Sequence, residues 1–187
     1  MSQHEKRSRH RRLAALAEEI SSTIPNPWLF PTRGKVQGFM GAAPVMFVAE
    51  RPSTGQFGGP ADHLLYTLLE KYGAANSHLT DVIKSRGKIK EPYPEDITPH
   101  RHIFDREIEI VRPRLIVAFG QKVYDLLQFS LAGSGIKVRQ VWHYSYTRRG
   151  LDKPAAFEKQ IQEALGEKPG SELNGIKIVP TPCMRDR

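Results

Sequence analysis

Continuous apolar runs alternate with helix-spaced apolar positions along this chain of 187 residues. Two runs, PVMFVAE at 44–50 and RLIVAFG at 114–120, are uninterrupted over the length of a strand, which is typical of strands buried on both faces. SHLTDVIK at 77–84 and IKVRQVW at 136–142 are two further strand candidates. Strands that alternate with helices predict a central sheet that is mainly parallel and four-stranded.

Helical spacing is clear between these runs. Leucines at 64, 65, 68 and 69 form one face of a helix over 60–72, where Pro60 suits the first turn and Gly73 the end. The same spacing predicts a short amphipathic helix over 13–20 and longer helices over 102–113, 121–129 and 153–165. The predicted fold is a single-domain α/β/α sandwich.

The amino-terminal residues 1–12, MSQHEKRSRHRR, are basic and poor in apolar side chains. They predict a flexible tail, either touching phosphates or simply solvated, ahead of one domain over 13–187. The whole chain has 28 Lys and Arg against 20 Asp and Glu, a net charge of +8. This excess favours a polyanionic partner, most often nucleic acid.

Composition also excludes several function classes. No apolar run approaches the roughly 18 residues of a membrane span, so no membrane partner is expected. The sole cysteine, Cys183, excludes an internal disulfide and any zinc site or iron–sulfur cluster built from several cysteines of this chain. We therefore expect no cofactor and no metal, and a reducing, cytoplasmic setting.

Polar residues gather where the predicted strands end. In parallel α/β folds, ligands bind at the carboxyl ends of the strands. Those ends carry Glu50 and Arg51, Asp81 and Lys84, Gly120 and Gln121, and His143 to Arg149.

Four segments, in order, carry a resemblance to the uracil-DNA glycosylase superfamily that runs from about Val45 to Gly150. AERPSTGQFGGPADHLL resembles the first motif of the iron–sulfur branch, a Gly-Glu-x-Pro-Gly loop followed by an aromatic and a glycine-rich helix start. LTDVIKSRG is similar to the strand that ends in Asn-Val-x-Lys-x-Arg. FDREIEIVRPRLIVAFGQKVYDLL is similar to the branch's helix–strand–helix segment. HYSYTRR stands where the family has its His-Pro-Ser motif.

The departures from that pattern concern the chemistry. The iron–sulfur branch uses four cysteine ligands, which this chain lacks. Arg51 stands at the position of the catalytic aspartate of the best-known branch, and an arginine cannot act as a general base. Asp81 stands at the position of the asparagine that reads the base, and Tyr144 and Tyr146 replace two prolines.

The resemblance implies a protein that flips a nucleotide out of DNA into a pocket. Phe57 is the candidate ring that stacks on the base, unless it only caps the core. His143 would donate a hydrogen bond to the base carbonyl as negative charge grows there, a preorganised electrostatic role. Arg51 and Ser53 are further candidates for base contact. The amides of Gly58 and Gly59 would bind a phosphate, unless they only form a turn.

The water-activating group has two candidates, Asp81 and Glu50. An ionised Asp81 only accepts hydrogen bonds, so it would read a ring N–H, prefer a base with an exocyclic amine or act on the water. In the alternative case, burial would hold Asp81 protonated and restore a donor. Glu50 would position or activate the water, unless it forms a structural ion pair with Arg51.

The remaining candidates would contact the DNA backbone or minor groove, or form solvated basic turns. They are Lys84, Ser145, Tyr146, Thr147, Arg148 and Arg149.

Two functions follow from the resemblance. The first is a monomeric, monofunctional DNA glycosylase that hydrolyses the bond to uracil or a related deaminated base and leaves an abasic site. The second is a catalytically weak protein of the same fold that binds damaged or abasic DNA. A hydrolase of free nucleotides is a third class, for which the basic amino terminus would have no use.

Overall fold

The computed structural model describes residues 2–53, 56–86 and 94–166, with side chains from residue 100 onward in the last range. Its centre is a parallel sheet in the order β2-β1-β3-β4, formed by β1 (Val45–Ala49), β2 (His78–Asp81), β3 (Leu115–Phe119) and β4 (Lys137–Val141). The predicted parallel four-stranded sheet and α/β fold are confirmed.

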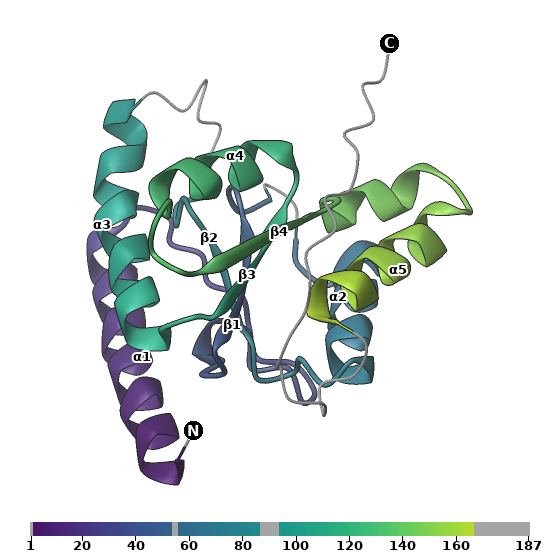
Figure 1. The fold of residues 1–187 in the computed structure, drawn as a ribbon. Helices are drawn as coiled ribbons and strands as arrows, with labels where there is room; N and C mark the ends of the chain where they lie inside the picture. Colours follow the sequence, from purple (N-terminus) through teal and green to yellow (C-terminus); the bar gives the residue numbers. More distant parts are fainter. Residues whose placement is uncertain (1, 54–55, 87–93, 167–187) are drawn as a thin grey trace.

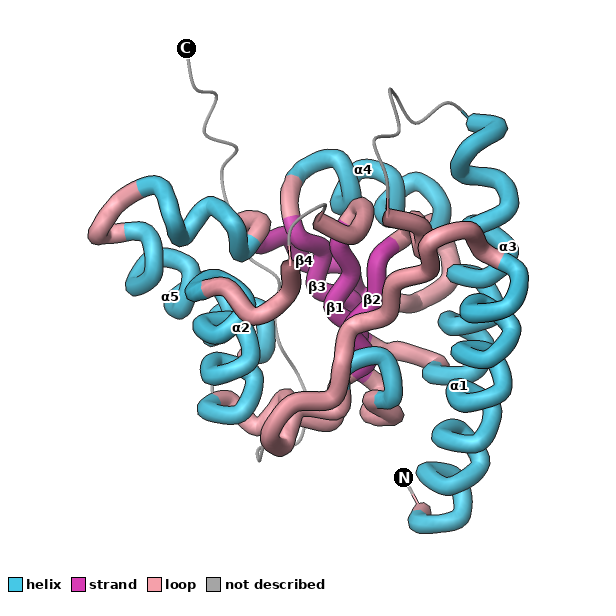
Figure 2. The backbone as a smooth tube through the Cα atoms, turned by 180° about the vertical axis from the view of Figure 1, so that it is seen from behind, coloured by secondary structure: helices cyan, strands magenta, loops and turns pink. Residues whose placement is uncertain are grey.

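Helices cover both faces of this sheet (Figure 1). The helices α1 (Gln3–Thr23), α3 (Pro94–Val111) and α4 (Gln121–Ser130) lie on one face, and α2 (Pro60–Lys71) and α5 (Lys153–Leu165) lie on the other. Seen from behind, α1 and α3 again lie side by side, across the sheet from α2 and α5 (Figure 2). None of the helices in the described residues is long and apolar enough to cross a bilayer.

Each face of the sheet has its own apolar core, because successive strand residues point to opposite faces. Met46 and Val48 of β1 pack among residues of α1, α3 and α4, whereas Phe47 and Ala49 pack among residues of α2 and α5. All four side chains are buried. This burial on both sides explains why the β1 sequence is uniformly apolar.

The helix α1 is longer than its apolar pattern predicted. Leu13, Leu16 and Ile20 are buried as expected, but the helix begins at Gln3, so residues 3–12 are helical and not the tail expected from composition. A capping box explains this start, because the Ser2 hydroxyl accepts from the Glu5 N–H and the Glu5 carboxylate accepts from the Ser2 N–H.

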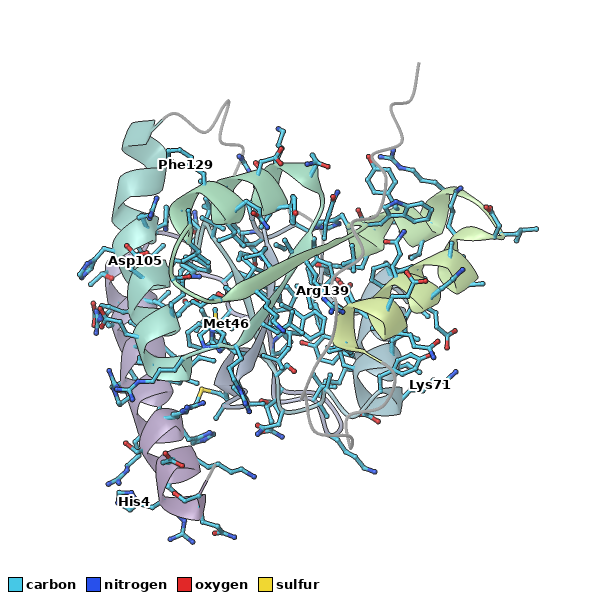
Figure 3. The ribbon with its side chains drawn as sticks, in the orientation of Figure 1. His4, Met46, Lys71, Asp105, Phe129 and Arg139 are labelled. Atoms are coloured by element: carbon cyan, nitrogen blue, oxygen red, sulfur yellow. The ribbon has the colours of Figure 1, made fainter. Side chains whose placement is uncertain are left out.

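One edge strand of the sheet is β4, and its middle residue, Arg139, holds the end of α5. The Arg139 guanidinium donates to the carbonyl oxygens of Glu163 and Ala164, at 2.5 and 3.0 Å. These carbonyls belong to the last turn of α5, where intrahelical donors run out. Arg139, labelled in Figure 3, thereby joins the edge strand to the end of α5.

The strand order places all four carboxyl ends at one edge of the sheet. Ala49 of β1 is in register with Asp81 of β2, and Phe119 of β3 with Val141 of β4. The chain leaves β1 toward β2 on one side and reaches β4 from β3 on the other, so the order reverses between β1 and β3. A crevice at such a reversal is the usual ligand site of open α/β sheets.

Candidate active site

A cavity of about 140 Å³ lies among the segments that follow the carboxyl ends of the strands. An apolar cavity of about 150 Å³ accommodates one benzene ring, so this space suits a single six-membered ring. Its lining comes from the loop after β1, the start of α2, the segments after β2 and β4 and one upstream loop: Trp28, Ser53, Gln56, Phe57, Gly59, Pro60, Ala61, Asp62, Arg86, His143, Tyr144, Ser145 and Arg148.

One wall of the cavity is aromatic. The Phe57 ring lies 5.7 Å from Trp28 and 5.3 Å, edge-on, from Tyr66, measured between centroids. The Arg86 guanidinium lies 3.8 Å above the Trp28 ring. Phe57 therefore lines the cavity and also packs against the core, a position that is compatible with both roles considered for it.

His143 is held in one orientation by the start of the short helix η2 (Tyr144–Arg149). Its Nδ1 accepts from the backbone N–H of Ser145 at 3.2 Å and lies 2.8 Å from the Ser145 hydroxyl. Because a backbone N–H can only donate, Nδ1 is unprotonated and a neutral imidazole carries its proton on Nε2.

Burial also favours the neutral form of His143. It lowers the pKa of the imidazole, against smaller opposing effects of Glu50 and Asp62. The ring stacks on Tyr144, with centroids 4.6 Å apart and an interplanar angle of 22°. A neutral, stacked imidazole with Nε2–H as its donor has the form needed to stabilise a developing anion.

The residues directly after β1 do not line the cavity. The Arg51 guanidinium lies 3.0 Å from the Glu50 carboxylate, which is the ion pair that the sequence left open for these two residues. Ser53 does line the cavity. The loop thus brings one of its three polar candidates to the cavity and pairs the other two with each other.

The glycine pair is occupied by a residue that the sequence did not single out. The N–H groups of Gly58 and Gly59 both donate to one carboxylate oxygen of Asp62, each at 3.0 Å. Asp62 is in the first turn of α2, where a carboxylate is favourable. The expectation that these two amides bind a phosphate is therefore wrong for this structure, because both already donate to the Asp62 carboxylate.

Asp81 is buried and is not part of the cavity lining. Burial raises the pKa of its carboxyl group to about 7; Glu107 adds to the rise, and Lys84 and Arg86 oppose it. Among the described residues, its Oδ2 atom has no hydrogen-bond partner. The charge of Asp81 also raises the pKa of Tyr144, after the larger effect of burial, and Tyr144 does line the cavity.

Lys84 does not contact solvent, which corrects its expected role at the DNA backbone. The side chain is 0% exposed, and its Nζ lies 2.9 Å from the carboxylate of Glu107 on α3. It also donates to the Thr80 hydroxyl at 2.6 Å and to the main-chain carbonyl of Asp81. A buried ammonium needs such partners, so its place is structural.

The segment after β4 also contains both exposed and buried candidate residues. Ser145 and Arg148 are exposed and line the cavity, and Arg149 is exposed with its guanidinium 4.4 Å from the Tyr146 ring. Thr147 is buried, and its hydroxyl donates to the carbonyl of Tyr144 at 2.7 Å. Its expected contact with DNA is corrected, because its hydroxyl is turned inward to hold η2.

Seven of the thirteen lining residues were missing from the sequence-based set of site residues, among them Trp28, Asp62 and Arg86. Asp62 had a usable signal, because it is the third residue after Gly59 at a helix start with Pro60, where capping carboxylates occur. Trp28 had none, because it lies in a proline-rich loop without periodicity. The ring reaches the site because that loop runs beside the segment after β2, where the Trp28 N–H donates to the Lys84 carbonyl at 2.7 Å.

In the described part of the chain, no three His, Cys, Asp or Glu side chains lie close enough together to hold a metal ion. The sole cysteine, Cys183, is outside the described residues.

Fold and cavity together define an α/β protein with a ring-sized, aromatic-walled site at the carboxyl edge of a short parallel sheet. Residues 38–166, more than half of the chain, match the family model of the uracil DNA glycosylase superfamily, and the chain belongs to this superfamily. No curated protein matches the chain. The membership supports a function of the DNA glycosylase type with DNA as the substrate.

Proposed function

We propose that this protein is a monofunctional DNA glycosylase that binds a flipped uracil, or a related deaminated base, in the cavity and hydrolyses its bond to the sugar. The observation that carries the proposal is the state of His143. Its Nδ1 is occupied by the Ser145 N–H, so its proton is on Nε2, in a ring that lines a cavity of the size of one base ring.

Each part of the cavity has a role in this proposal. The Phe57 ring stacks on the base, with Trp28 as its support, and Ser53 contacts the base edge. Arg51, which was also expected at the base edge, lies outside the cavity lining and is paired with Glu50. Nε2–H of His143 donates to the base carbonyl while the departing base gains negative charge, which lowers the barrier to cleavage. The exposed Ser145, Tyr146, Arg148 and Arg149 contact the DNA on either side of the flipped nucleotide.

The attacking water requires a carboxylate, and we propose Asp81 for this role. Its Oδ2 lacks a partner within the described residues, and its pKa of about 7 matches the range of an effective general base at neutral pH. Glu50 is the alternative, with its carboxylate already paired to Arg51. Asp81 would then read the base edge instead.

Two substitutions separate these roles. Asp81→Asn should be nearly inactive on every base if Asp81 acts on the water, because an amide cannot take up a proton there. If Asp81 reads the base, the same variant should keep or raise activity on uracil and change the ranking among bases. Loss of turnover in Glu50→Gln alone would assign the water to Glu50.

The test of the function itself is base release. Oligonucleotides that contain uracil, hypoxanthine, xanthine or an abasic site are incubated with the protein, and alkali-labile cleavage is scored at single turnover. We expect cleavage of the uracil strand or of one other deaminated base. The abasic strand is cleaved by alkali without enzyme and serves as the positive control, so absence of cleavage on the uracil, hypoxanthine and xanthine strands would refute the proposal.

One observation favours the second candidate, a protein that binds damaged DNA without turnover. The position that carries the catalytic aspartate in the best-known branch is Arg51, and Arg51 engages Glu50. On this alternative, the protein retains abasic or uracil-containing DNA in a gel shift with no release of base. The same panel distinguishes the two functions.

A further inference from the structure

A second concave surface lies at the other end of the sheet. It is a groove of about 620 Å³ between the first turns of α1 and the loops that precede β1 and β2. Its lining consists of Lys6, Arg7, His10, Arg11, Ala42 and Asn76. We call these six residues the amino-end groove. None of them is acidic, and the four from α1 have exposed side chains.

The amino-end groove is held together by contacts between α1 and the loop before β1. The Arg9 guanidinium donates to the Ala42 carbonyl at 3.3 Å. The Ala42 N–H donates to the Asn76 side-chain oxygen at 3.3 Å, and the Ala43 N–H to the Asn76 carbonyl at 2.9 Å. With that oxygen occupied, the Asn76 side chain keeps its amide N–H groups as donors. The groove therefore offers donors on both of its sides.

This groove and the cavity share no residue and belong to opposite edges of the sheet. Ala42 and Asn76 precede β1 and β2, whereas the cavity residues follow the strands. Strands of four to five residues place these edges about 13–17 Å apart. In Figure 3 the label His4 marks the end of α1 that projects away from the rest of the fold. A duplex seated at the cavity therefore leaves this groove open.

The spacing of the basic side chains suits a phosphate backbone. Lys6 and His10, and likewise Arg7 and Arg11, are four residues apart on α1, which is about 6 Å along the helix axis. Alternate phosphates of one DNA strand are about 7 Å apart along the duplex axis. The groove has no aromatic residue among its six, whereas protein interfaces are usually anchored by aromatic side chains. These features favour nucleic acid over an acidic protein.

We propose that the amino-end groove binds the phosphodiester backbone of a second nucleic-acid segment, separate from the segment whose base enters the cavity. Lys6, Arg7 and Arg11 supply the positive charge, and Asn76 supplies neutral donors. The protein then holds two stretches of DNA at once. This role needs no base release, so it stands or falls independently of the glycosylase activity.

The test compares two variants of the full chain that lose the same charge. Arg7→Ala/Arg11→Ala removes two residues of the groove. Arg12→Ala/Lys159→Ala removes one exposed residue of the same helix and one of α5, neither of which lines the groove. All four side chains are on helix surfaces, so both variants should melt within about 2 °C of the parent protein.

The first measurement is bridging: an immobilised undamaged duplex and a labelled undamaged duplex are mixed with each protein, and the captured label is counted. Parent and control should capture the label, and the groove variant should capture at least tenfold less. The second is the salt dependence of duplex binding, whose log–log slope should become shallower by about 1.8 when two phosphate contacts are lost.

Three outcomes would overturn the proposal. The first is a groove variant that bridges like the control and keeps its salt slope. The second is a parent protein that does not bridge. The third is displacement of the labelled duplex by polyglutamate at a lower charge concentration than by unlabelled duplex, which would assign the groove to an acidic protein.

Discussion

The segments that follow β2 and β4 present similar polar sequences but opposite environments. At the end of β2, its last residue Asp81 is 3% exposed, and Lys84, three residues further on, is 0% exposed. After β4, Ser145, Arg148 and Arg149 are exposed, and Ser145 and Arg148 line the cavity. The difference comes from α3, which places the Glu107 carboxylate 2.9 Å from Lys84 and within 3.4 Å of His78. Within the described residues, no carboxylate pairs with Arg148 or Arg149.

A charged residue at a strand end therefore does not reveal from the sequence whether it is buried or exposed. That depends on whether a counter-charge from another element packs against it. Burial raises the pKa of Glu107, but Lys84 and His78 outweigh it and leave that pKa below its usual value. The β2 segment therefore contains a buried ion pair that fixes the end of the strand. The β4 segment leaves its positive charge exposed.

The largest expected effect tests the buried ion pair after β2, and it is a loss of unfolding free energy. Glu107→Gln leaves Lys84 buried without its counter-ion, and loss of one partner of a buried pair costs about 3–5 kcal/mol. Urea unfolding should show this loss, whereas Glu109→Gln, exposed on the same helix, should stay within about 0.5 kcal/mol of the parent. Equal stability of the two variants would show that the ion pair is unimportant.

The next effect is the pH dependence that Asp81 imposes on folding. Its pKa is about 7 in the folded protein against an ordinary 3.8, so the folded state holds the proton more tightly than the unfolded state. The contribution of Asp81 is most favourable below about pH 4 and falls as the pH rises to 7, by about 4 kcal/mol in total.

Asp81→Asn removes this titration. The variant should gain stability relative to the parent as the pH rises from 4 to 8, measured by urea unfolding at each pH. A stability difference between the two proteins that does not change with pH would contradict the raised pKa.

At the exposed segment, the expected effect is on chemistry. In the proposed function, His143 acts on charge that develops only in the transition state, so His143→Ala should slow single-turnover base release by about 100-fold or more. Binding of abasic product DNA should stay close to that of the parent. His102→Ala, at an exposed position of α3, is the control and should release base normally. A weakened product affinity with an unchanged rate would place His143 in binding and not in catalysis.

The smallest effect concerns Phe57. Base–aromatic stacking contributes roughly 1–3 kcal/mol, so Phe57→Ala should weaken processing of the target base by a factor of about 5 to 150. Because Phe57 also packs against Trp28 and Tyr66, the variant should lose some stability as well. Phe129→Ala removes an identical ring that is 87% exposed on α4 and should change neither property. A less stable variant that remains fully active when folded would make Phe57 purely structural.

The fold could be predicted from the sequence largely because its central strands are buried on both faces. The runs around Phe47 and Val117 are apolar without interruption, and the helix from Pro60 has a clear start. The start of α1 was missed, because a Ser2–Glu5 cap holds ten residues that have almost no apolar pattern.

The candidate site was only half predictable. His143 and Phe57 were found through the resemblance, and both line the cavity. Lys84 and Thr147 could not be excluded from the site on sequence alone. The burial of Lys84 depends on Glu107, which is distant in sequence, and that of Thr147 depends on the turn of η2. Trp28 could not be included, because its position depends on how two loops align across the β2 edge.

The charged edge strand β4 has a consequence for how copies of this protein behave at high local concentration. An exposed strand edge is a template for pairing with another chain, and lysine or arginine along it opposes such pairing. Lys137 and Arg139 occupy the first and third positions of β4, and Arg139 is also tied to α5. Molecules crowded along one DNA should therefore stay separate and resist aggregation through their sheets.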